Sequence, residues 1–212
     1  MQSVTWDMRY AGATSFPGMI LWGAGGATPM GAPGTYQVRL RADGREQTQS
    51  FRIRRNPLHV GVTDADLQAQ FDLAIQIRDK TSEANNAVIQ IRAIKMAVAD
   101  RLTKSPDAQL KARGDTLVGN LSAVEGEIYQ VKNQSGQDPL NFPIKVNNRL
   151  ASLLGIVSAG DSRPIGNAGP IFKELTADLK ALTDRLAKVL ASDLAAFNVE
   201  AKRLGLDPVV EK

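Results

Sequence analysis

The spacing of apolar positions along this chain changes near Asn56. Before that residue, apolar and polar side chains alternate with a period of two, which is typical of a strand with one buried face. After it, apolar residues recur every three to four positions, which indicates amphipathic helices. The pattern therefore predicts two units, residues 1–56 and 63–212, joined by a linker at residues 57–62.

The clearest local signal is a β-hairpin over residues 35–54. Its two strands alternate apolar and polar positions, and Asp43-Gly44 between them is a pair that tolerates the positive φ angles of a tight hairpin turn. The inward-facing positions are then expected to be Tyr36, Val38, Leu40, Phe51 and Ile53.

Upstream of the hairpin, two further runs resemble strands. Val4, Trp6 and Met8 alternate with polar residues, and residues 19–22 form a short apolar run. About four strands result, whereas an immunoglobulin-like sandwich needs about seven. We therefore expect a partial immunoglobulin-like sheet, a truncated β-sandwich segment. Either the missing strands precede Met1, which is then an internal methionine, or the helices cover the apolar face; we favour the first.

The second unit reads as four helices, at about 63–102, 106–133, 143–158 and 170–203. Thr63 is a predicted N-cap with Asp66 at the capping-box position. Because the connections are short, consecutive helices are expected to be antiparallel neighbours. The predicted fold is thus α+β, with the partial sheet followed by an antiparallel up-down-up-down four-helix bundle.

Polar residues interrupt the apolar stripes of the first and last helices. Arg78, Asn85 and Arg92 recur every seven positions, and Asp193 continues an apolar column of the last helix. In an up-down-up-down bundle, this spacing places Arg78 level with Asp193.

The same count places Asn85 near Asn147 and Asn148 at the start of the third helix. A buried polar group needs a hydrogen-bonding partner, so we expect these six residues to form a structural polar cluster. A ligand site and a register-fixing core network both fit such a cluster, and we favour the network.

The net charge of +4 is concentrated in the first unit, where residues 1–60 carry seven arginines against three acidic residues. A phosphate-binding face is conceivable, but charged outward positions on an edge strand explain the same pattern. Basic residues do not alternate with aromatic ones as in single-strand binders, so we expect no nucleic-acid partner. We also expect no membrane span, since prolines and glycines break the longest uncharged stretch.

Few residues offer chemistry. The chain has no Cys, and its single histidine, His59, lies in the predicted linker, so we expect no metal site and no cofactor. The stretch Gly23 to Gly26 lacks the Lys-Ser/Thr ending of a phosphate loop. We expect no catalytic residue and no hydrolase activity. The N-terminus lacks the basic and apolar regions of a signal peptide.

Several segments together resemble one family. They are VTWDMRYAGA, FPGMILWG, PGTYQVRLRADG, TDADLQAQFDLAIQIRDKTSEANNAV, PLNFPIKVNNRLASLLGIVSAGD and LAAFNVEAKRLGL. Nearly the whole chain resembles the C-terminal region of large exported bacterial proteins described as sortilin-like β-propellers or BNR-repeat glycosyl hydrolases.

This resemblance implies a periplasmic or secreted parent protein, in which an immunoglobulin-like segment leads into the helices. Because the chain carries no Asp-box repeat, no catalytic residue transfers to it. The expected function is a non-catalytic C-terminal module whose partner is the propeller portion of the same polypeptide, with a packing or assembly role. The alternative is a free-standing helical interaction or oligomerisation protein with a hairpin appendage.

Overall fold

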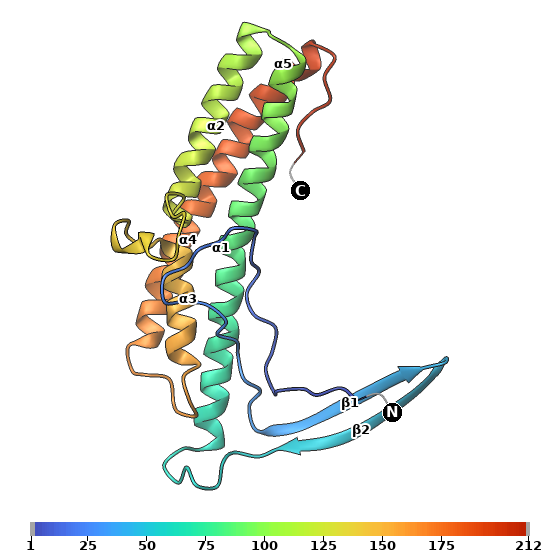
Figure 1. The fold of residues 1–212 in the computed structure, drawn as a ribbon, viewed down its shortest axis with the longest axis vertical. Helices are drawn as coiled ribbons and strands as arrows, with labels where there is room; N and C mark the ends of the chain where they lie inside the picture. Colours follow the sequence, from blue (N-terminus) through green and yellow to red (C-terminus); the bar gives the residue numbers. More distant parts are fainter. Residues whose placement is uncertain (1–2, 211–212) are drawn as a thin grey trace.

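The computed structural model describes residues 3–210 and is an α+β structure, in which a long helical bundle carries a projecting β-hairpin (Figure 1). The elements in chain order are β1 Gly34–Ala42, β2 Arg45–Ile53, α1 Asp64–Lys104, α2 Ala108–Ile128, the 3₁₀ turn η1 Asp138–Leu140, α3 Val146–Val157, α4 Ala168–Val189, the π-helical turn η2 Leu190–Leu194 and α5 Ala195–Arg203.

The predicted hairpin is confirmed. β1 and β2 pair antiparallel, with Tyr36 opposite Phe51, and the turn residues Asp43 and Gly44 have φ angles of 51° and 73°. Two consecutive positive φ angles match the right-handed twist of the flanking strands. The ribbon projects from the lower part of the bundle, so most of its residues are exposed (Figure 1).

The expected four-stranded immunoglobulin-like sheet is wrong, because within residues 3–210 the sheet consists of β1 and β2 alone. The run at residues 4–8 is broken by a local turn. Asp7 accepts a hydrogen bond from the Arg9 amide at 3.0 Å, and Met8 has a φ of 64°, which a strand cannot hold. A single bridge, Arg9 to Met30, replaces the expected ladder.

The apolar run at residues 19–22 is no strand either. The Tyr129 hydroxyl and the Asn148 carboxamide take backbone hydrogen bonds of this run in place of a neighbouring strand. It belongs to a long irregular segment, residues 10–31, which we call the N-terminal arch. The arch passes along α1, turns across it near mid-height and returns to β1 (Figure 1). Phe16 of the arch is only 7% exposed and packs in the same core as the helices. The division into 1–56 and 63–212 stays a prediction, but the arch packs on the helices.

Helix α1 begins as its sequence predicts. Thr63 accepts a hydrogen bond from the Asp66 amide at 3.1 Å, and Asp66 accepts one from the Thr63 amide at 3.0 Å, which completes the capping box. The helix then runs for 41 residues to Lys104. At about 1.5 Å per residue it spans roughly 60 Å, the full length of the bundle.

The helices form three columns, which corrects the predicted up-down-up-down bundle. α2 descends along the upper half of α1, and α3 continues in the same direction along its lower half (Figure 1). α4, η2 and α5 then ascend together, parallel to α1. Asp66 at the start of α1 accordingly bonds Arg163 ahead of α4 at 2.7 Å, and Arg101 near its end bonds the Asp207 carbonyl at 3.0 Å.

The core of the upper half is closely packed. The Gly114 backbone of α2 faces Leu102 and the buried ring of Phe197, and a Cβ at Gly114 would lie 3.1 Å from Leu102 Cδ1. Glycine therefore allows α2 to approach both neighbouring columns. Within residues 3–210, every helix is too short or too polar to cross a lipid bilayer.

Candidate functional site

Two of the predicted cluster residues meet inside the bundle. Asn147 Nδ2 of α3 donates to Asn85 Oδ1 of α1 at 3.0 Å, and the two side chains are 0% and 1% exposed. Asn85 Nδ2 in turn donates to the Thr14 carbonyl of the arch at 2.7 Å. The heptad count predicts the proximity of the two asparagines. It does not predict the contact with Thr14, because the arch is irregular and its sequence has no periodicity.

Asn148 binds both backbone groups of one arch residue. Its Oδ1 accepts from the Trp22 amide at 2.7 Å, and its Nδ2 donates to the Trp22 carbonyl at 3.0 Å. A carboxamide can do this because it carries one acceptor and one donor group side by side. Asn148 thus takes the place that a neighbouring strand would have beside Trp22, and it is only 3% exposed.

Two further side chains bind the arch and were not predicted from the sequence; together with Asn85 and Asn148 we call them the anchors of the arch. Tyr129, directly after α2, accepts from the Ile20 amide at 3.0 Å, and Ser82 of α1 accepts from the Thr14 amide at 3.0 Å. Neither side chain interrupts an apolar stripe, so a search for misplaced polar residues does not find them. The anchors share one chemistry, because each contacts main-chain atoms of the arch.

Arg92 lies in a second, part-buried network. Its Nε donates to Glu125 at 2.7 Å, and Glu125, only 4% exposed, also accepts from Lys95 at 3.1 Å. The Arg92 guanidinium lies 4.7 Å from the Phe16 ring centroid and 5.3 Å from that of Tyr129. Stacking of this kind combines cation–π attraction with burial. The network therefore holds Phe16 of the arch against α1 and α2.

The predicted contact of Arg78 with Asp193 is wrong. Arg78 donates to Asp79 at 2.6 Å and to the Ala11 carbonyl at 3.1 Å, whereas Asp193 accepts from Asn120 of α2 at 2.7 Å. The error follows from the topology. Because α1 and α4 are parallel, Arg78 lies low in the bundle and Asp193 lies in η2, above its middle.

The pKa of one carboxyl group at the base of α1 is well below its ordinary value. Hydrogen bonds from Thr63 and Arg163 lower the pKa of Asp66 to about 2, and they outweigh the opposing effect of its desolvation. His59 Nδ1 lies 3.7 Å from Asp161 Oδ2 nearby, and both side chains remain partly exposed. Within residues 3–210, no three His, Cys, Asp or Glu side chains gather as metal ligands would.

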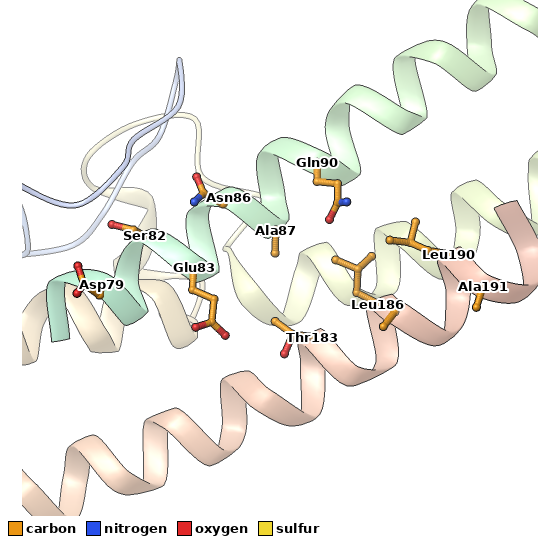
Figure 2. A pocket seen from close by; sticks show the side chains of 11 residues that line it. Asp79, Ser82, Glu83, Asn86, Ala87, Gln90, Thr183, Leu186, Leu190 and Ala191 are labelled. Atoms are coloured by element: carbon orange, nitrogen blue, oxygen red, sulfur yellow. The ribbon is translucent and has the colours of Figure 1, made fainter. Parts of the chain in front are cut away.

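A surface groove of about 740 Å³ lies between α1 and α4. Figure 2 shows Glu83 and Ala87 of α1 on one side of the groove and Thr183 and Leu186 of α4 on the other. Glu83 is paired with Lys80 at 2.5 Å. An ion pair within one helix accounts for this carboxylate.

Comparison with family models, with curated proteins and with solved structures gives no match for this chain.

Proposed function

We propose that this chain is a non-catalytic packing module of an exported β-propeller protein, and that it docks through its hairpin. The observation that supports this proposal is the exposed apolar face of the ribbon. Val38, Leu40 and Phe51 lie on this face and are 56%, 63% and 39% exposed. Gln49 and Gln47 lie opposite Val38 and Leu40 on the same face. Large apolar side chains that are exposed together in this way are typical of a surface that a partner covers.

The apolar face is also preorganised. Trp6 lies over it, with its ring centroid 5.6 Å from Tyr36 and 6.2 Å from Phe51, and Tyr36 stacks on Phe51 at 5.8 Å. Aromatic rings held in this way lose little conformational freedom on binding. Because an isolated two-stranded ribbon is only marginally stable in water, a bound partner would also stabilise the hairpin itself.

The two faces of the ribbon suit a partner β-sheet. Arg39, Arg41 and Arg52 occupy the opposite face, where the first two pair with Glu46, so that face is suited to solvent. Sheets pack face to face at about 10 Å through apolar side chains. We propose that the β-rich, propeller-bearing portion of the same polypeptide supplies this sheet, as the family resemblance implies.

The test compares two neighbouring positions on opposite faces, Val38→Lys and Gln37→Lys. The probe is the separately purified propeller-bearing region of a protein of the resembled family, titrated calorimetrically with the full chain. We expect wild type and Gln37→Lys to bind alike and Val38→Lys to bind at least about tenfold more weakly, since lysine cannot be buried there without a partner.

Failure of the wild type to bind would contradict the proposal, as would equal binding by Val38→Lys. Sedimentation of the chain alone distinguishes the alternative. Self-association that Val38→Lys abolishes, without binding to the propeller region, would instead identify an oligomerisation protein.

A further inference from the structure

The N-terminal arch does not fill the space beneath it. A cavity of about 240 Å³ lies between the arch and the helices. Two stretches of small residues, 12–15 and 24–28, form much of its wall, while Thr81 and Asn85 of α1 and Leu154 of α3 face it from the bundle. A cavity of about 150 Å³ already holds a benzene molecule, so this one has room for a ring and a polar substituent.

The walls determine which chemistry fits. All the lining residues are uncharged, although 23% of the whole chain is charged. An ion placed here would lose its hydration without gaining a countercharge, so the cavity favours neutral molecules. Met19, Leu21 and Leu154 supply apolar wall, which suits a hydrocarbon body.

One polar group in the wall lacks a partner. The Thr28 hydroxyl is buried and makes no hydrogen bond within residues 3–210. Its oxygen is inaccessible to a water-sized molecule, so a guest in the cavity does not reach it. The Thr81 hydroxyl already donates to the Ile77 carbonyl at 2.8 Å, and Asn85 holds Thr14. These three side chains therefore offer a guest little polar contact, and its binding rests on the apolar wall.

The anchors explain why the cavity persists. Ser82 and Asn85 hold Thr14 at one side, and Asn148 holds Trp22 at the other, so the arch cannot collapse onto the helices. Between Ala24 and Ala27 the arch carries no side chain larger than a methyl group, so the arch does not fill the space with its own atoms.

We infer that the space beneath the arch is a binding site for a small neutral molecule that has an apolar body. This site is separate from the hairpin and does not depend on the proposed docking function.

The experiment uses the full ¹⁵N-labelled chain and three probes of one size: cyclohexanol, cyclohexylammonium and cyclohexanecarboxylate. We expect cyclohexanol to shift the amide resonances of residues 12–15 and 24–28 in a saturable manner, and the two charged probes to leave them unchanged. Occupation of the cavity by water only would appear as no saturable shift with any probe, and it would overturn the inference. Equal binding of a charged probe would overturn it as well.

Two variants locate the site. Ala151→Leu adds a side chain from α3 into the cavity and should abolish the cyclohexanol shifts, whereas Ala112→Leu, on an exposed part of α2, makes the same change elsewhere and should not. Unchanged cyclohexanol binding in Ala151→Leu would refute the assignment.

Discussion

Single asparagine side chains hold the N-terminal arch because a carboxamide can pair with a backbone amide and a backbone carbonyl at once. Position 148 shows this directly, since Asn148 takes both groups of Trp22. The heptad count predicted that Asn85 lies near Asn147, since it placed Asn85 level with the start of the third helix. It did not predict their backbone partners, because Thr14 and Trp22 lie in a segment without periodicity.

Replacing Asn148 by alanine should lower the free energy of unfolding by about 1–3 kcal/mol, since the Trp22 amide and carbonyl would lose their partners in a part-buried site. Asn120→Ala is the control. It removes a hydrogen bond to Asp193 that lies at the surface, and should cost less than about 0.5 kcal/mol. Urea unfolding measures both, and equal losses would show that Asn148 is no anchor.

Asp66 should make stability depend on acid pH. Its pKa falls from 3.8 to about 2 on folding, so its stabilising effect is complete above about pH 4 and is lost as the pH falls through about 2. The difference in melting temperature between wild type and Asp66→Asn should therefore shrink from pH 5 to pH 2. In Asp115→Asn, which removes an exposed pair with Lys111, the melting temperature should change little at pH 5. A constant Asp66→Asn difference would contradict the assignment.

At the scale of elements, Phe16 fastens the arch to the helices. The ring is 7% exposed, meets Tyr129 edge-on at 5.1 Å and lies under Arg92. Phe16→Ala should cost about 3 kcal/mol and should speed hydrogen exchange at the Ile20 and Trp22 amides, because the arch loosens. Trp6→Ala, at a residue 42% exposed, should cost less than about 1 kcal/mol and leave those amides protected. Unchanged exchange in Phe16→Ala would mean that the polar anchors suffice.

The ends of the helices could be predicted from sequence better than their directions. Thr63 and Asp66 form the expected cap, and the hairpin turn falls where Asp43-Gly44 places it. The direction of α3 could not be read from its connection, because residues 129–145 allow the chain to continue downward as well as to reverse. The helix lengths are consistent with α2 and α3 lying end to end beside α1. The 21 residues of α2 and 12 of α3 together approach the 41 of α1, as two halves of one column would.

For the whole molecule, the structure predicts an order of proteolysis. Trypsin should cut first after the exposed arginines of the hairpin and of residues 54–55, while the arch stays bound to the bundle through its backbone anchors and Phe16. The arch fragment should therefore co-elute with the helical fragment in size exclusion and separate from it only in denaturant. Elution of the two fragments apart under native conditions would show that the arch depends on its covalent connection.

The α+β class and the hairpin followed from sequence patterning, but the number of strands did not. A period of two in a sequence records alternation, and it cannot tell whether the backbone groups between those side chains find a neighbouring strand. At residues 4–8 a local turn replaced that neighbour, and at residues 20–22 Tyr129 and Asn148 did.

The anchoring of the arch through main-chain atoms has an evolutionary consequence. Every residue except proline offers the same amide and carbonyl. Substitutions within the arch that place no proline at an anchored position therefore leave its attachment to Asn85, Asn148 and Tyr129 intact as long as Phe16 is kept. Selection for folding then acts on the helices and leaves much of the arch free to diverge. A lineage of this protein could change the chemistry of the arch by single mutations without rebuilding the scaffold beneath it.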